Sequence, residues 1–254
     1  MIKVLIYFIF GLSFCSCEHT ITREDSYPKE PSFSSKDGTP KDSLSFYLPA
    51  VMRVDTGVCD VELDTFRENW FSSALYSAQE RILFNYYLGH DIYRFLWLRS
   101  FHRPVIISLN RKGNRFWLTT KELNKQPNFM DLSYVKIVDP ATLPNTEIDS
   151  AYVYGNGLAF DSISKADRKA SIILNETKPL SEKEWQEFEE ILNSFSFWTA
   201  KPYIESFGVD GSEWTIEGHL KGKYWFVNRW SPKDNFRKAG EYLIKKSGLK
   251  EEIY

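Results

Sequence analysis

Histidine and cysteine are scarce in this chain of 254 residues, which holds 4 and 3 of them. The histidines stand at positions 19, 90, 102 and 219, and the chain contains none of the HxH, HExxH or CxxC spacings that commonly hold zinc. A G-x-S-x-G nucleophile elbow is also missing. We therefore expect neither a metal site nor a bound cofactor, and we assign no catalytic residue.

A surplus of positive charge is absent too, since the formal net charge is −2 and acids and bases are mixed along the chain. Proteins that bind nucleic acid carry a basic domain with clustered lysine and arginine. The densest basic run, which begins at Asn110, is typical of a solvated turn. The composition therefore argues against a nucleic-acid partner.

No apolar run has the roughly 20 residues that a membrane-spanning helix needs. The N-terminus has one positive residue, Lys3, and then an apolar run of eleven residues from Val4 to Phe14, which fits the centre of a secretion signal. The run ends at Cys15 and Cys17, and Ser16 is the small residue before Cys17.

This order of charge, apolar run and cysteine resembles the signal of bacterial lipoproteins. The resemblance implies that residues 1–16 are a signal peptide, and that Cys17 is acylated with chains such as palmitate and becomes the new N-terminus. It places the protein in the bacterial cell envelope, anchored to a membrane and facing the periplasm or the cell surface. An ordinary secretion signal or an apolar first strand is the alternative.

The mature chain would then keep a single thiol, Cys59, so it cannot form an internal disulfide. Residues 17–43 contain Pro28, Pro31 and Pro40, scattered serines and alternating charges, which predicts a disordered tether with a reach of about 30 Å. We expect residues 44–254 to form a single globular domain.

The periodicity within that domain predicts an α+β fold, with a mainly antiparallel sheet of hairpins and helices packed on one face. A capping box at Thr65 and Glu68 predicts a helix over about 64–76, with a possible extension toward Gly89. Three further sets of elements are expected: strands at 92–100, 103–110, 115–123 and 169–176; an irregular segment at 124–165; and helices at 179–195 and 234–248.

The aromatic stretch from Asp210 to Pro232 predicts a hairpin that turns at Lys221 and Gly222. In this register His219 faces Tyr224, Glu217 faces Phe226 and Thr215 faces Asn228, all on one side of the ribbon. The other side is more apolar and is expected to pack on the body. Glu217, His219 and Tyr224 on the polar side form either a general acid–base cluster or a set of structural partners.

The same stretch, together with residues 93–105 and the helix that begins at Ser181, resembles a group of exported bacterial proteins of unknown function. The resemblance covers about residues 60–249, and His219 lies outside the shared pattern. Since that group has no assigned activity, the resemblance implies no chemistry. The pattern consists of Asp210, Gly211, Trp214, Glu217, Gly218, Gly222, Tyr224, Arg229, Trp230, Ser231 and Pro232.

We therefore expect a lipid-anchored extracytoplasmic protein that binds a protein partner or another component of the envelope. One alternative is an envelope hydrolase that uses Glu217 with Tyr224 or Arg229, and another is an immunity-type inhibitor of a toxin. The candidate binding surface consists of the hairpin and the turn around His102, with the residues Asp210, Trp214, Glu217, Tyr224, Arg229, Trp230 and His102.

Overall fold

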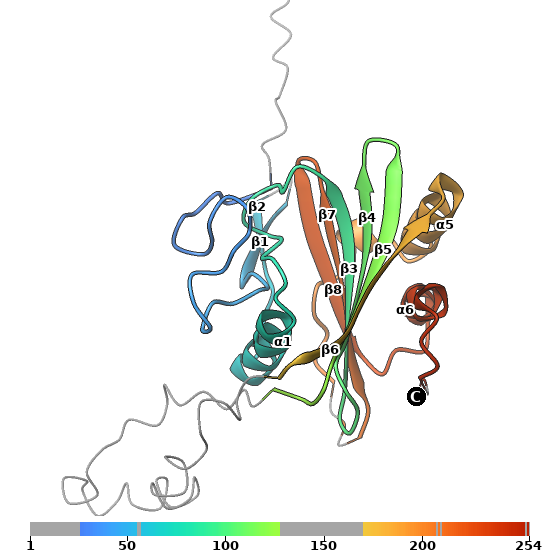
Figure 1. Ribbon diagram of the computed structural model, residues 1–254. Helices are drawn as coiled ribbons and strands as arrows, with labels where there is room; N and C mark the ends of the chain where they lie inside the picture. Colours follow the sequence, from blue (N-terminus) through green and yellow to red (C-terminus); the bar gives the residue numbers. More distant parts are fainter. Residues whose placement is uncertain are drawn as a thin grey trace, which may run out of the picture.

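Six antiparallel strands form the central sheet of this protein, in the order β6-β5-β4-β3-β7-β8 (Figure 1). The computed structural model describes residues 26–54, 57–127, 170–206, 208, 210–251 and 253. The strands are β3 (Asp91–Arg99), β4 (Val105–Lys112), β5 (Arg115–Leu123), β6 (Ile172–Leu180), β7 (Ser212–Leu220) and β8 (Lys223–Trp230). A separate pair contains β1 (Val51–Val54) and β2 (Gly57–Asp60). The expected α+β class is confirmed.

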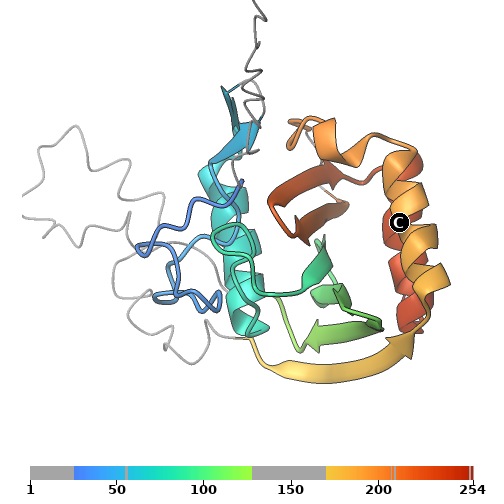
Figure 2. The same ribbon diagram turned by 90° about the horizontal axis from the view of Figure 1, so that it is seen from above.

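Helices lie on both faces of the sheet, as the two views show (Figures 1 and 2). The sequence predicts that all helices pack on one face of the sheet. Helix α5 (Glu182–Asn193) and helix α6 (Asn235–Ser247) do share one face. Helix α1 (Thr65–Ser77) lies on the other face beside β1 and β2. A short 3-10 helix, η2 (Phe197–Thr199), follows α5. The sheet is thus the middle layer of three.

The helix ends follow local capping chemistry. Ser181 caps α5 with a capping box to Glu184, and Asp234 caps α6, both as predicted. Helix α1 is capped by Asp64, whose carboxylate accepts from the backbone N–H of Arg67, so Thr65 is its first helical residue rather than its cap.

Helix α1 also ends at Ser77 without the possible extension toward Gly89. Gln79 has a φ of 55°, a left-handed conformation that a helix cannot continue through. The backbone N–H of Glu80 turns back to the carbonyl of Leu75 at 3.0 Å, which closes the helix end.

Residues 26–43, which the sequence assigns to a disordered tether, belong to the folded body. Tyr27 and Ser34 are buried, and the side chain of Asn85 bonds both the N–H and the C=O of Glu30 at 2.8 Å. The Nδ2 atom of Asn85 also donates to the Ser34 hydroxyl at 2.9 Å. The expected domain start at Leu44 is therefore wrong. Side-chain contacts hold this segment on the body, and such contacts leave no periodic pattern in the sequence. The expected signal peptide at residues 1–16, Cys17 and most of the expected irregular segment 124–165 lie outside the described residues.

The hairpin register predicted from the sequence is confirmed, with His219 opposite Tyr224 and Glu217 opposite Phe226. However, the polar side of the ribbon, which the sequence predicts to face away from the body, is also buried. It faces α1 and the segment 26–50, and Glu217, His219 and Tyr224 are all buried. The polar side chains are tolerated there because they bond to one another and to the backbone.

Candidate functional site

The buried polar side of the β7–β8 hairpin centres on an ion pair between Arg94 of β3 and Glu217 of β7, which are paired across the strands. The Nε and Nη2 atoms of Arg94 both lie 2.6 Å from Oε2 of Glu217. The hydroxyl of Tyr224 donates to Oε1 of Glu217 at 2.9 Å. Arg94 also contacts Glu80 at 3.3 Å, and Lys121 contacts the same carboxylate at 2.7 Å. Two cations therefore balance two carboxylates.

The electrostatics of this network favour a structural role. Burial raises the pKa of Glu217, while the Arg94 charge opposes the rise. Because arginine remains charged in proteins and lies 2.6 Å from this carboxylate, we take Glu217 as ionised at neutral pH. Burial and the Glu217 charge raise the pKa of Tyr224 well above its ordinary value, so its hydroxyl remains a donor. Both oxygens of Glu217 accept hydrogen bonds and the side chain is buried, whereas a general base must reach a substrate proton.

His219 is a second buried group on this side. Its Nδ1 bonds the carbonyl of Leu83 at 2.7 Å, and its Nε2 accepts from the backbone N–H of Leu88 at 3.0 Å. These partners fix the neutral imidazole with its proton on Nδ1. Burial lowers the pKa of His219 to about 4. Tyr27 packs edge-on against the ring, so the histidine joins the hairpin to residues 27 and 83–88.

Two of the predicted surface residues project to the opposite face of the sheet. Trp214 is fully buried and packs against Phe95 at 5.3 Å between ring centroids. Arg229 is half-buried and donates to the backbone carbonyls of Lys201 at 2.9 Å and Asn228 at 2.6 Å. Of the two partners that the hydrolase alternative names for Glu217, Tyr224 therefore lies beside the carboxylate and Arg229 does not.

The remaining three residues of the candidate surface lie at the far end of the sheet. The turn that holds His102 contacts the start of β7, where the backbone N–H of Ser100 donates to the carbonyl of Gly211 at 3.1 Å. Asp210, which precedes Gly211, is exposed, and the side chains of His102 and Trp230 are partly exposed. The seven candidate residues thus divide among two faces and two ends of the sheet and do not form one surface.

Packing explains the glycines of the shared pattern. A Cβ on Gly218 would lie 2.6 Å from Trp198 and 2.8 Å from Phe197, and one on Gly211 would lie 2.5 Å from Ser231 Oγ and 2.6 Å from the ring of Trp230. Gly222 has a φ of 78° in the hairpin turn. These positions require glycine for close approach or turn geometry, so their role in the hairpin is structural.

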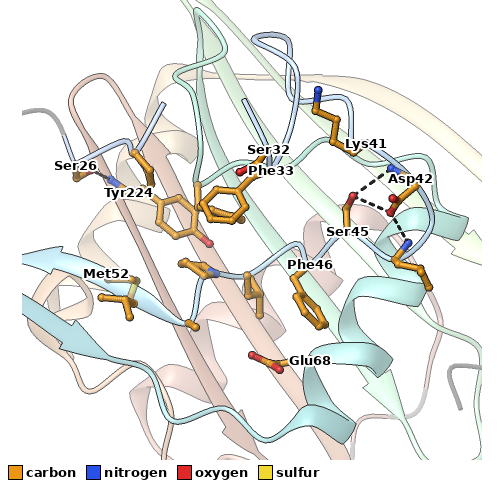
Figure 3. A pocket seen from close by; sticks show the side chains of 17 residues that line it. Ser26, Ser32, Phe33, Lys41, Asp42, Ser45, Phe46, Met52, Glu68 and Tyr224 are labelled. Carbon is orange, nitrogen blue, oxygen red and sulfur yellow. Dashed lines mark hydrogen bonds between the residues drawn. The ribbon is translucent and has the colours of Figure 1, made fainter. Parts of the chain in front are cut away.

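A groove of about 640 Å³ opens on the α1 face, on the outer side of Tyr224 (Figure 3). This volume falls within the range of small-molecule sites. Phe33, Phe84 and Tyr224 form a continuous aromatic wall, with ring centroids 5.4 and 6.2 Å apart. The lining residues are Ser26, Pro28, Ser32, Phe33, Lys41, Asp42, Leu44, Ser45, Phe46, Leu48, Pro49, Ala50, Val51, Met52, Glu68, Phe84 and Tyr224.

A few polar groups accompany the apolar lining. Lys41, Asp42 and Ser45 gather at one end of the groove, where Asp42 and Ser45 are hydrogen-bonded (Figure 3). Glu68 of α1 lies on another side, and burial raises its pKa. The groove can therefore hold an apolar body with a polar end.

Sequence reasoning missed this groove because most of its lining comes from residues 26–52, whose first part is predicted to be a tether. One signal was present in the composition. Two large apolar residues, Tyr27 and Phe33, stand in the part predicted as a tether, and a solvated tether has no reason to contain them.

A second, smaller cleft of about 230 Å³ lies between α5 and the hairpin tip. It is lined by Tyr93, Glu189, Leu192, Asn193, Trp198, Leu220 and Lys223. Glu217 lines neither hollow.

Within the described ranges, no three histidine, cysteine, aspartate or glutamate side chains come close enough to hold a metal ion. The same part of the chain contains no helix long and apolar enough to cross a membrane.

No protein-family model, no curated protein and no solved structure matches this chain significantly.

Proposed function

We propose that this protein is a lipid-anchored binding protein of the bacterial envelope, and that it binds an apolar or amphipathic molecule in the groove between residues 26–52, α1 and Tyr224. The observation that carries the proposal is the groove itself. It has the volume of a ligand site, a wall of three aromatic rings and a few polar groups among an apolar lining.

The anchor is the second part of the proposal and depends on the sequence at Cys17. A lipoprotein-type signal followed by a folded body at Ser26 would hold the groove near a membrane. The buried, fully paired state of Glu217 favours binding over hydrolysis, because the groove then offers no free carboxylate from the hairpin.

A substitution that fills the groove tests the binding proposal. Ala50 is exposed and lines the groove, so Ala50→Trp occupies the space without removing a packed side chain. Thr177→Trp on β6 is a matched control, since this exposed position lies at the opposite edge of the sheet. The probe is N-phenylnaphthylamine, whose fluorescence rises in apolar sites, added to the mature chain carrying Cys17→Ala.

We expect saturable binding to the parent protein and to Thr177→Trp. Ala50→Trp should weaken binding at least about tenfold, which corresponds to about 1.4 kcal/mol. Absence of saturable binding to the parent, or equal binding by all three proteins with equal urea midpoints, would overturn the assignment of the groove.

A further inference from the structure

Exposed apolar side chains are concentrated around the groove. The described residues include eight large apolar side chains that are exposed, and four of them line this one groove. They are Phe33 at 44%, Leu44 at 72%, Phe46 at 44% and Val51 at 46% exposure. Single exposed apolar residues are common on protein surfaces, but a contiguous group marks a surface that contacts a partner or a membrane. We call these four residues the groove rim.

The chain reaches the body at the groove. Ser26 lies in the groove wall and is fixed to β8, because its N–H donates to the carbonyl of Gly222 at 3.3 Å and its hydroxyl accepts from the N–H of Tyr224 at 2.7 Å. Ser26 follows Cys17 by nine positions, and nine residue steps span at most about 30 Å when the chain is fully extended.

This distance is comparable to the body itself, since a strand of nine residues such as β7 is about 30 Å long. A lipid at Cys17 therefore keeps Ser26, in the groove wall, within about 30 Å of the anchor and lets the groove side reach the bilayer. The charges along residues 26–52 do not oppose such an approach, because three lysines and three acids cancel: Lys29, Lys36, Lys41, Glu30, Asp37 and Asp42.

We propose that the groove rim inserts into the surface of the membrane that holds the anchor, so that the groove opens onto the lipid. This inference rests on the lipid anchor of the proposed function. Several acyl chains at Cys17 already give stable attachment, and an apolar surface beside them adds a contact that orients the body on the bilayer. We propose that a bilayer surface covers the groove rim. The experiment below distinguishes this contact from a docked protein.

Site-directed spin labelling tests the insertion. The lipidated mature protein with Cys59→Ser is labelled at Leu44→Cys or, as the matched control, at Phe101→Cys, which replaces an exposed aromatic side chain that does not line the groove. Both proteins are reconstituted into liposomes of phosphatidylethanolamine and phosphatidylglycerol. The accessibility of each label to oxygen is compared with its accessibility to a water-soluble nickel chelate.

We expect the label at position 44 to favour oxygen over the nickel chelate several-fold more than the label at position 101. Labels that are equally accessible to the chelate, on protein that floats with the liposomes, would overturn rim insertion and leave the anchor intact. A label at 44 that is shielded from both reagents would also overturn it, since a protein surface then covers the rim. Protein that does not float would overturn the anchor and the insertion together.

Discussion

Glu217 shows why a polar residue in an aromatic hairpin need not be a site residue. The sequence predicts its strand, its register and its cross-strand neighbours, and the structure confirms all three. The sequence does not reveal Arg94 as its partner, because that contact depends on how β3 pairs with β7. Pairing between strands that are distant in sequence decides whether such a carboxylate is free or neutralised.

Replacing Glu217 with glutamine should destabilise the fold strongly. The amide removes the charge opposite buried Arg94, which then keeps its ionic contact with Glu80 at 3.3 Å and a hydrogen bond to the carbonyl of Arg81. We expect a loss of about 3 kcal/mol in the free energy of unfolding, measured with urea. Glu176→Gln at an exposed position on β6 should change it by less than about 0.5 kcal/mol. Equal stabilities for the two variants would show that Glu217 is not part of a buried ion pair.

His219 predicts a pH dependence of stability. Its pKa is lowered to about 4 from the ordinary 6.5, so the unfolded chain binds a proton more readily than the folded protein. The stabilising contribution is complete above about pH 6.5 and is lost as the pH falls toward 4. Between pH 7 and pH 5 the native protein should lose about 2 kcal/mol more stability than His219→Gln.

Unfolding curves at the two pH values measure this difference, and an NMR titration of the imidazole gives the pKa directly. A His219 pKa above 6, with the same pH response in both proteins, would contradict the buried neutral tautomer.

At the scale of single elements, helices were predicted more reliably than the segments around them. Helices α5 and α6 carry caps and apolar periodicity in their own sequence, and both formed as expected. The N-terminal segment has neither signal, and it is ordered by the side chain of Asn85 and by the hairpin. Local periodicity cannot report contacts of this kind, so the tether prediction was wrong from residue 26 onward.

Gly240 in α6 tests the packing between this helix and the sheet. A Cβ at this position would lie 2.2 Å from the ring of Trp214 and 3.0 Å from Phe95. Although alanine favours helices over glycine by about 1 kcal/mol, we expect Gly240→Ala to destabilise the protein by about 2 kcal/mol. The measurement is the urea midpoint, with exposed Lys238→Ala in the same helix as the control. A stabilised Gly240→Ala protein would mean that α6 does not pack this closely on Trp214.

At the scale of the whole molecule, we expect the groove side and the proposed N-terminal anchor to act together at a membrane. The resemblance of the N-terminus to a lipoprotein signal implies attachment through a lipid, and the structure adds an apolar rim beside Ser26, where the described chain begins. The groove could not be predicted, because its lining combines residues 26–52 with Glu68, Phe84 and Tyr224 from three separate parts of the chain.

Cys17→Ala should move the protein from the membrane fraction to the soluble fraction. The rim alone buries too few side chains to survive an alkaline carbonate wash, whereas several acyl chains do. Cys59→Ser is the matched control, since it removes the other thiol that the mature chain would keep. Equal retention of all three proteins after the wash would mean that another part of the chain holds the membrane.

Mass spectrometry of the N-terminal peptide from the protein purified out of bacterial membranes tests the central claim most directly. We expect a peptide that begins at position 17 and carries diacylglycerol on the cysteine sulfur. An unmodified cysteine, or residues 1–16 still attached, would contradict the anchor and with it the location of the groove beside a membrane.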